Sequence, residues 1–425
     1  MICPETKAAP LTIIDAMAPT AEAEAAAWLM TPDAIRTRAR MVLDAGLAGG
    51  LEHFVVRMDR LDTAAAYACE TILANYPDLD IPYHARWRHF MVAGQDRWAG
   101  MANPTDRDER ARIAFDLVVT SVLLDAGAGD AWRYVDPVSG TTIKRSEGLA
   151  IASLNAFRDG LFSSHPSTPL KADMEGLLSV SQDGLARAFQ VEPDNPLEGL
   201  DGRTRLINAL GHAVQAKPEL FGKTAPRIGG LYDHLAARSK GGTLDATQIL
   251  DAVLTGLGSI WPGRMELAGC NLGDTWRHPA ARADGPSDRL VPFHKLSQWL
   301  TYSLVEPLEE ADIRVRNLDG LTALAEYRNG GLLVDLGVLE PRHDNVTTQP
   351  HAPGDEIIVE WRALTVALID ELAIAIRSRL GLDADELPLA KVLEGGTWSA
   401  GRRIAQEKRA GGGPPIQIVS DGSVF

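Results

Sequence analysis

Residues 321–339 read LTALAEYRNGGLLVDLGVL, and this stretch carries the clearest fold signal in the chain. Apolar residues recur at helical spacing on both sides of the polar segment 328–331. The two adjacent glycines in that segment can adopt the positive φ that ends one helix and starts another. The pattern therefore predicts a helix–hairpin–helix with Glu326 and Asp335 at the edges of the apolar stripes. A helical hairpin with two surface acids fits the same spacing equally well.

The composition indicates an ordinary soluble globular protein. The chain has 425 residues, of which 45% are hydrophobic and 23% charged. A formal net charge of −15 argues against a nucleic-acid partner or an anionic membrane surface. Cys3, Cys69 and Cys270 are too few and too scattered for a disulfide framework, and the first ten residues do not resemble a signal peptide. Charges interrupt the most apolar helix candidate, 361–380, so we expect no membrane span and a cytoplasmic location.

The periodicity predicts one large helical domain over residues 20–410, made of an N-terminal part (20–105) and a body (106–410). Residues 1–19 and 411–425 are expected to be tails. A small hairpin is expected within 130–144. The expected helices are 22–29, 32–47, 51–58, 62–75, 107–127, 146–162, 170–180, 183–189, 203–215, 226–238, 244–255, 292–307, 356–380 and 388–409.

The densest basic and aromatic cluster lies in residues 76–90, YPDLDIPYHARWRHF. We expect a helix to open at Ile81-Pro82 and to carry Arg86, Arg88 and His89. In an acidic protein such a cluster can form the wall of a pocket that holds an anion. An exposed basic helix with an inward tryptophan is the alternative.

Residues 256–279, GLGSIWPGRMELAGCNLGDTWRHP, break the helical pattern. Irregular segments rich in glycine and tryptophan are often ligand loops on a rigid scaffold, so Asp274 and Trp276 are candidate binding residues. The stretch contains neither a P-loop nor a GxGxxG turn. Cys270, Asp274 and His278 fit no standard zinc spacing, and we expect no metal and no cofactor.

Residues 292–307, PFHKLSQWLTYSLVEP, form an amphipathic helix candidate. Lys295, Gln298 and Tyr302 share one face at i, i+3 and i+7, opposite a clean apolar stripe. That face is a candidate ligand wall, although an ordinary exposed face fits as well. In the helix 356–380, Glu360 and Arg362 lie near the apolar stripe.

These residue types suit the hydrolysis of an N-glycosidic bond. The reaction passes through an oxocarbenium-like transition state, which needs a carboxylate near the sugar and donors for the leaving group and any phosphate. Glu326 with Lys295, Gln298 and the upstream Arg/His cluster supplies them. An amide hydrolase or a non-catalytic ligand binder would use the same inventory, and the residues alone do not choose.

Resemblance narrows the choice. Over roughly residues 20–415 the chain resembles the uracil-catabolism protein four family, which implies a role in the route that opens the uracil ring and releases urea through ribosylurea-type intermediates. The strings that carry the resemblance are IPYHARWRHF (81–90), GDTWRHP (273–279), LVPFHKLSQWLTYSLVEPL (290–308), EYRNGGLLVDLGVL (326–339) and VEWRALTVALID (359–370).

A more distant similarity is to the queuosine 5′-phosphate nucleosidase family. PFHKLSQ, LTALAEYRNGGLLVDLGVL and EWRALTVALID resemble, in order, its FYK-x-AQ, LTMFADYRVPQ-x-L-x-x-LGVL and E-x-R-A-x-T motifs. This similarity implies a mostly α, helix–hairpin–helix DNA-glycosylase-like fold with a few short strands. Glu326 replaces the motif aspartate, and Lys295 and Gln298 match its lysine and glutamine. Residues 329–331 replace Val-Pro-Gln, which puts the recognition of the base in question.

The resemblances together imply an N-ribosyl hydrolase acting on a ribosylurea or a pyrimidine-derived ribonucleoside, with the 5′-phosphate preferred. Glu326 would be catalytic. The alternatives are an amide or ureide hydrolase of the opened ring and a non-catalytic nucleotide-binding subunit; the oligomeric state stays open. The expected binding residues are Lys295, Gln298, Arg86, Arg88, His89, Asp274, Trp276, Arg328 and Asn329, with Asp335, Tyr302, Glu360 and Arg362 in support.

Overall fold

The computed structural model describes residues 20–101, 106–261 and 265–419. It is mostly helical with a few short strands, as the sequence predicts. The expected tail 1–19 and the end of the expected tail 411–425 lie outside the described residues. In the described part of the chain, no helix has both the length and the apolarity needed to cross a membrane.

The longer elements follow the predicted order closely. The α-helices are α1 (Ala21–Leu29), α2 (Pro32–Leu47), α3 (Leu61–Asn75), α4 (Arg107–Leu123), α5 (Arg145–Arg158), α6 (Met174–Ser179), α7 (Gln182–Ala188), α8 (Leu200–Ala216), α9 (Pro218–Phe221), α10 (Gly230–Arg238), α11 (Ala246–Leu257), α12 (Lys295–Glu310), α13 (Tyr327–Asp335), α14 (Asn345–Thr348), α15 (Glu356–Leu380), α16 (Leu389–Lys391) and α17 (Ser399–Lys408). A π-helix, η5 (Val392–Trp398), joins α16 to α17, and a short 3₁₀ helix, η2 (Arg86–Phe90), follows α3.

The strands form two-stranded ladders that fasten loops to one another. The antiparallel pairs are β1 (Phe54–Val56) with β12 (Leu339–Pro341), β2 (Met91–Val92) with β3 (Gln95–Asp96), β4 (Tyr134–Val135) with β5 (Thr142–Ile143), β7 (Glu266–Leu267) with β8 (Cys270–Asn271), and β9 (Thr275–Arg277) with β10 (Leu290–Pro292). The parallel pairs are β6 (Thr243–Asp245) with β11 (Arg314–Arg316) and β13 (Pro350–His351) with β14 (Gln417–Ile418).

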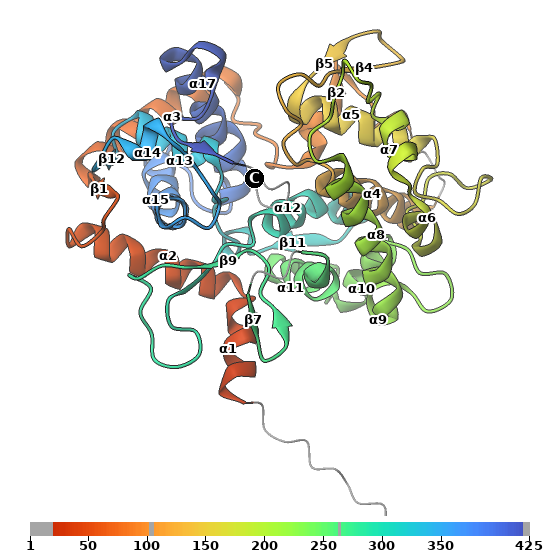
Figure 1. The fold of residues 1–425 in the computed structure, drawn as a ribbon, viewed down its shortest axis with the longest axis horizontal. Coiled ribbons are helices and arrows are strands. Elements are labelled where there is room, and N and C mark those ends of the chain that lie inside the picture. The colour runs from red at the N-terminus through yellow and green to blue at the C-terminus, as the bar shows by residue number, and fades with distance from the viewer. Residues whose placement is uncertain (1–19, 102–105, 262–264, 420–425) are drawn as a thin grey trace, which may run out of the picture.

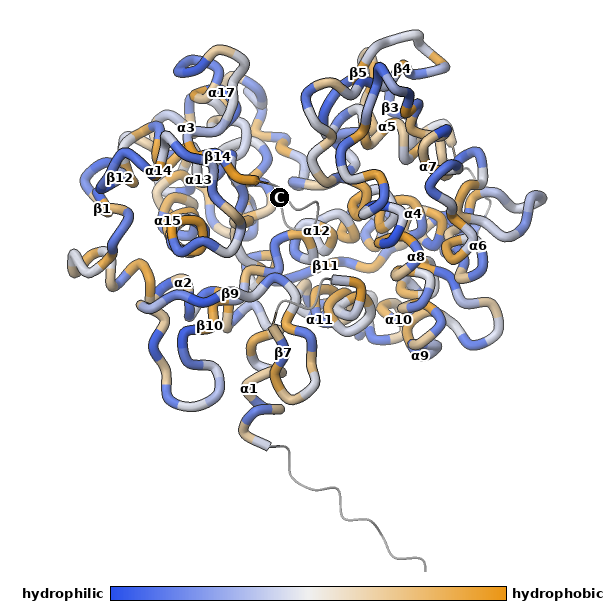
Figure 2. Tube along the Cα trace, viewed as in Figure 1, coloured by the Kyte–Doolittle hydropathy of each residue, from blue (hydrophilic) through white to orange (hydrophobic). Residues whose placement is uncertain are grey.

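Helix α12 lies between two groups of helices (Figure 1). On one side α15 packs against α2 and α3, and α13 packs against α17. On the other side α4 contacts α5, α8 and α10, and α12 itself contacts α4 and α11. Apolar residues gather along α4, α12 and α15, the elements that face neighbours on several sides (Figure 2). The chemistry-bearing residues of α12 are therefore placed where the two groups meet.

Helices α2 and α15 have the predicted bounds, and a local signal accounts for one end of each. The Thr31 hydroxyl accepts the Ala34 N–H, and Pro32 occupies the first turn of α2. Helix α15 spans the predicted residues 356–380 and ends at Gly381, whose φ of 70° favours glycine. The predicted hairpin within 130–144 is confirmed as the β4–β5 pair.

The helix–hairpin–helix predicted for residues 321–339 is wrong. Residues 321–326 run without helical structure, and one helix, α13, continues through Arg328, Gly330 and Gly331. Neither glycine has positive φ. The Glu326 side chain caps the N-terminus of α13. A helix therefore begins here, whereas the sequence pattern predicted that a helix ends here.

Close packing explains Gly330. A Cβ on this residue would lie 2.7 Å from the Thr365 hydroxyl oxygen and 2.7 Å from the Trp361 indole nitrogen, both on α15. The glycine therefore lets α13 approach α15, and its backbone freedom is not used. The prediction of a turn at residues 328–331 was wrong because Gly330 serves helix packing and not a change of chain direction.

This contact yields a testable difference between two glycines. Gly330→Ala should destabilise the protein by about 1–3 kcal/mol, because the added methyl overpacks a buried helix contact. Gly202→Ala should instead stabilise it by about 0.5–1 kcal/mol, because Gly202 is an exposed residue of α8 with nothing within 4 Å of its Cβ position. Urea unfolding of both variants measures the two signs. Equal effects would contradict the packing role of Gly330.

Two other local predictions are wrong. Residues 51–58 do not form a helix, because 54–56 form β1, which pairs with β12 far along the sequence. Ile81-Pro82 does not open a helix either, and the basic cluster has only the 3₁₀ turn η2. The His84 N–H bonds to the Ala390 carbonyl, so a tertiary contact holds this segment extended. The finer expectation of a glycosylase-like arrangement stays a prediction.

Candidate functional site

Four donor side chains converge where α12 meets η2; we call Arg86, His89, Lys295 and Trp299 the Trp299 cluster. Lys295 and Trp299 lie one turn apart on α12, and the lysine Nζ is 5.8 Å from the indole centroid. Segment η2 brings the Arg86 guanidinium to 5.7 Å and the His89 ring to 5.9 Å from the Trp299 ring. The indole face is thus shared by three nitrogen-bearing groups from two distant parts of the chain.

Three members of the cluster, Arg86, Trp299 and Lys295, keep a donor that no described residue satisfies. Arg86 Nη2 and Trp299 Nε1 are buried without a hydrogen-bond partner. The Lys295 ammonium is half-buried and forms no hydrogen bond or ion pair within residues 20–101, 106–261 and 265–419. Buried donors are normally satisfied, so convergence of several such groups indicates a ligand site.

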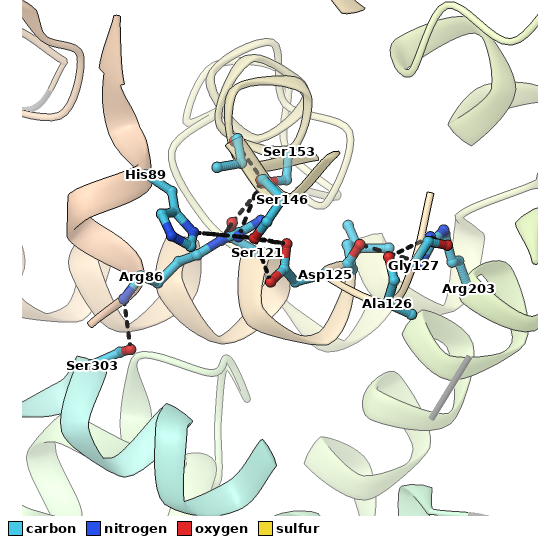
Figure 3. A network of polar contacts seen from close by, with 12 residues as sticks. Arg86, His89, Ser121, Asp125, Ala126, Gly127, Ser146, Ser153, Arg203 and Ser303 are labelled. Atoms are coloured by element: carbon cyan, nitrogen blue, oxygen red, sulfur yellow. Dashed lines mark hydrogen bonds and ion pairs between the residues drawn. The ribbon is translucent and has the colours of Figure 1, made fainter. Parts of the chain in front are cut away.

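Arg86 is fixed by a dense polar network (Figure 3). Its Nη1 donates to Asp125 at 2.6 Å and to Ser146, and its Nε donates to Ser121 at 2.9 Å. Its backbone N–H donates to Ser303 on α12. Burial lowers the pKa of Arg86, and Asp125 opposes that shift. The guanidinium is held rigidly with Nη2 left over, which suits it to an anionic or carbonyl group of a ligand.

His89 is kept neutral. Burial, reinforced by the neighbouring Arg86 charge, lowers its pKa well below the ordinary histidine value. Its Nδ1 lies 3.1 Å from Arg86 Nη1, a group that can only donate. Nδ1 is therefore the acceptor and Nε2 carries the proton, so the ring offers one N–H donor beside Trp299 and Trp398.

Three carboxylates, Glu326, Asp125 and Asp274, lie in electrostatic range of Lys295. Burial lowers the pKa of its ammonium group, and Glu326 and Asp125 oppose the shift. The Glu326 oxygens accept the N–H groups of Arg328 at 2.7 Å and Asn329 at 2.5 Å, which fixes the buried carboxylate at the start of α13. Burial raises the pKa of Asp125, against the pull of Arg86 and Ser146. The site thus pairs fixed carboxylates with unsatisfied donors.

Asp274 anchors the start of α12. Its carboxylate receives both terminal nitrogens of Arg362 at 2.8 Å, the Trp276 indole N–H at 2.7 Å and the Lys295 backbone N–H at 3.1 Å. Burial disfavours the charged form, but Arg362 and the other donors outweigh it and hold the pKa of Asp274 below its usual value. Asp274, Trp276 and Arg362 therefore position Lys295, and the Asp274 oxygens are already engaged.

Several other predicted binding residues are satisfied inside the protein. Gln298 exchanges hydrogen bonds with Thr322, and the Tyr302 hydroxyl donates to the Thr322 carbonyl at 3.0 Å. Asn329 donates to the Leu324 carbonyl at 3.1 Å and accepts from the Thr397 hydroxyl at 2.8 Å. These contacts hold the non-helical segment before Glu326.

The remaining predicted residues have hydrogen-bond partners outside the Trp299 cluster. Four make specific contacts elsewhere: Arg88 with Glu306, Arg328 with the Gly412 carbonyl, Asp335 with Arg409, and Glu360 with the N–H groups of His53 and Phe54. The described residues do not bring Cys270, Asp274 and His278 into one possible metal-ligand group.

Sequence reasoning missed the contribution of the C-terminal helices. The π-helix η5 places Glu394 2.7 Å from His84 Nδ1 and ends at Trp398, whose ring lies 5.6 Å from His84. π-Helical turns are rare and are often found at functional sites. The glycine pair 395–396 was the available signal, because it interrupts an otherwise helical pattern. Asp125 gave no signal, since it follows α4 as one of many acids.

Comparison with known proteins places the chain in a family. A family model described as "Protein of unknown function (DUF1688)" matches residues 28–425. The chain belongs to the DUF1688 family. It is 37% identical over 412 residues to "Protein urg3" of Schizosaccharomyces pombe, covering 95% of this chain and 99% of the relative. It is 38% identical over 410 residues to "Uracil catabolism protein 4" of Lachancea kluyveri, covering 88% of this chain and 92% of the relative.

These relatives confirm the resemblance to the uracil-catabolism protein four family, over nearly the whole length of the DUF1688 chain. The more distant similarity to the queuosine 5′-phosphate nucleosidases finds no support in these matches. The catalytic role of Glu326, which rests on that similarity, therefore stays a prediction.

Proposed function

We propose that this DUF1688 protein is an N-ribosyl hydrolase of uracil catabolism, with a ribosylurea or related pyrimidine-derived ribonucleoside, preferably as the 5′-phosphate, as its substrate. The pathway is suggested by the name of the L. kluyveri relative. The observation that carries the reaction class is the Lys295 ammonium, which has no hydrogen-bond partner in the described chain and lies in electrostatic range of Glu326 and Asp125.

The cluster supports binding of an anionic sugar. Lys295 and Arg86 Nη2 are cationic donors without a carboxylate of their own at those atoms, so a phosphate or ribose oxygen can satisfy them. The Trp299 ring lies beside both donors, and the Trp398 ring lies 6.4 Å from the His89 ring of the same cluster. An overall charge of −15 does not oppose this, because a local cluster of cations decides the binding of a small ligand.

Glu326 is the proposed catalytic carboxylate. As the C1′–N bond breaks, positive charge develops on the ribose ring, and a fixed carboxylate stabilises it. Water then adds its oxygen to C1′ and gives one proton to Glu326. Glu326 passes that proton to the departing urea nitrogen, so that urea, the C1′ hydroxyl product and the free carboxylate remain. The two α13 N–H groups orient Glu326 before the substrate arrives, so little reorganisation is needed.

The arrangement of Ser146 disfavours the alternative of a serine-dependent amide hydrolase. Ser146 Oγ lies between Asp125, at 2.7 Å, and His89 Nδ1, at 3.2 Å. In a catalytic triad the histidine lies between the serine and the acid and removes the serine proton. Here Nδ1 also faces Arg86, so His89 is a poor base for Ser146.

Glu326→Gln tests the proposal directly. Incubation of the purified protein with ribosylurea 5′-phosphate should release urea and ribose 5-phosphate, and the variant should lose at least about 100-fold in kcat, in line with loss of a transition-state charge interaction. Urea and the reducing sugar are measured together. Because the cap is partly retained by the glutamine oxygen, the unfolding temperature should fall only slightly.

Glu340→Gln is the matched control, since Glu340 is a half-exposed carboxylate paired with Arg57, which directly follows β1. It should keep full activity. Release of ammonia without ribose 5-phosphate would contradict the proposal and identify a ureide hydrolase. Tight binding without turnover would contradict it and identify a non-catalytic binding subunit. Equal urea release by both variants would remove Glu326 from the mechanism.

A further inference from the structure

Two histidines and two glutamates gather at the start of α15, outside the Trp299 cluster. Glu356 and Glu360 lie one turn apart on α15. His53 directly precedes β1, and His278 directly follows β9. The fold therefore brings together four residues that lie in three separate stretches of the sequence. None of them has a role in the reaction proposed above.

Their ligand atoms fall into two neighbouring groups that are joined by Glu356. His278, Glu356 and Glu360 offer three ligand atoms within 4.8 Å of one another, and Glu52, His53 and Glu356 offer a second such group. Glu356 belongs to both groups. Tetrahedral ligands about 2.1 Å from zinc lie about 3.4 Å apart, so modest side-chain rotation would close either group around an ion.

The charge balance of the cluster is unusual for a protein interior. Glu360 is fully buried, and one of its oxygens accepts the backbone N–H groups of His53 at 3.1 Å and Phe54 at 2.9 Å. Its other oxygen faces His278 Nε2 at 3.3 Å. Among the described residues, no Arg or Lys side chain pairs with Glu356 or Glu360. Buried carboxylates are normally paired with a cation or bound to a metal.

His53 is oriented as a metal ligand. Its Nδ1 lies 3.0 Å from His343 Nε2, and its Nε2 lies 3.8 Å from Glu356. When Nδ1 donates to His343, the Nε2 lone pair is free and points toward Glu356. Such a hydrogen bond from the second ring nitrogen is what fixes metal-binding histidines elsewhere. Glu356 is half-exposed, which leaves the ion a path from solvent.

His278 carries its ring proton on the nitrogen that would bind the ion. The Ala280 N–H donates to its Nδ1 at 3.2 Å, so Nε2 carries a proton and donates it to Glu360. An ion bound at Nε2 would replace that proton and leave the ring proton on Nδ1. Nδ1 could then no longer accept the Ala280 N–H, so that hydrogen bond would be lost. We expect His53 and Glu356 to bind the ion first, with Glu360 and His278 completing the coordination.

We propose that His53, His278, Glu356 and Glu360 form a divalent transition-metal site, of the mixed nitrogen and oxygen type that suits Zn²⁺ or Mn²⁺. The site would fasten β9 and the β1–β12 ladder to α15. Because Asp274 precedes β9 and Arg362 lies on α15, the same ion would stabilise the two elements whose ion pair supports Lys295.

Metal titration of the full-length protein tests the site. After treatment with a chelator and dialysis, calorimetry with ZnCl₂, and separately with MnCl₂, should give one ion per chain for at least one of the metals, and that metal should raise the unfolding temperature. Glu356→Gln should weaken binding by at least about 100-fold, and His343→Phe by about 10–100-fold, as for a residue that orients a ligand. These readouts do not depend on the proposed activity.

His165→Ala is the control, because His165 is an exposed histidine outside the cluster, and its metal affinity should be unchanged. Glu356 is half-exposed, so its substitution should leave folding intact, which circular dichroism checks. Absence of binding for both metals, or equal affinity in the Glu356→Gln and His165→Ala proteins, would overturn the site.

Discussion

Lys295→Met is expected to weaken the binding of ribose 5-phosphate by about 100-fold while leaving the protein as stable as before or more so. The ammonium is half-buried without a hydrogen-bond partner in the described chain, so the folded protein carries its desolvation cost. Methionine keeps the apolar stem against Trp299 and removes that cost. A loss of about 2–3 kcal/mol of ligand interaction corresponds to the expected change in affinity.

The stability and the anion affinity of the wild-type protein should both depend on pH through the ionisation of Lys295. Burial lowers the folded-state pKa of Lys295 below the ordinary value of 10.5, so the unfolded chain binds more protons between the two pKa values. The charged Lys295 therefore lowers the free energy of unfolding by its full amount below the folded-state pKa. This loss of stability disappears as the pH rises from the folded-state pKa to the unfolded-state pKa. Affinity for an anion should fall over the same rise, because Lys295 loses its charge.

Lys391→Met is the matched control for this prediction. Its Nζ lies 5.9 Å from the Tyr83 ring centroid, so it too is a partly buried lysine beside an aromatic ring, but outside the Trp299 cluster. Calorimetric titration with ribose 5-phosphate should show unchanged affinity. Equal affinity in the two variants, or a large loss of stability in Lys295→Met, would contradict the role given to Lys295.

Asp274→Asn is expected to cost about 3–5 kcal/mol of unfolding free energy, the largest stability effect that we predict. The change removes the carboxylate from a buried, bidentate ion pair with Arg362 and leaves the guanidinium charge without it. It also weakens the hydrogen bonds that the Trp276 indole N–H and the Lys295 backbone N–H donate to residue 274. Urea unfolding at pH 7 measures the effect, and binding of ribose 5-phosphate should weaken with it.

Asp62→Asn provides the comparison, because Asp62 and Arg379 form a largely exposed pair of 2.6 Å, against 2.8 Å for the buried pair of Asp274 and Arg362. Its loss should cost less than about 1 kcal/mol. Since the pKa of Asp274 is lowered in the folded state, its contribution to stability is fully present above the unfolded-state pKa of 3.8 and is lost as the pH falls through the folded-state pKa. Similar costs for the two substitutions would show that burial does not set the strength of the Asp274 pair.

The sequence by itself determined the long helices and the family. Periodicity located α2, α4 and α15 because each has a strong apolar pattern, and the Thr31-Pro32 start signal set the beginning of α2. The expected end of α4 at residue 127 was four residues too late, since the helix ends at Leu123. The motif strings placed the chain in its family because they are long and ordered. Lys295, Arg86 and His89 were singled out by residue type, and the fold brings these three together around Trp299.

Only the tertiary structure decided how residues 321–339 are used. The packing of α15 against Gly330 makes residues 327–335 one helix, and Glu326 becomes its cap. The partners of Asp125, Gln298 and Glu360 were likewise beyond local inference, because each bonds to residues distant in sequence. Periodicity reports which face of an element is buried, but a side chain's partner depends on the element packed against it, and that is set by the whole fold.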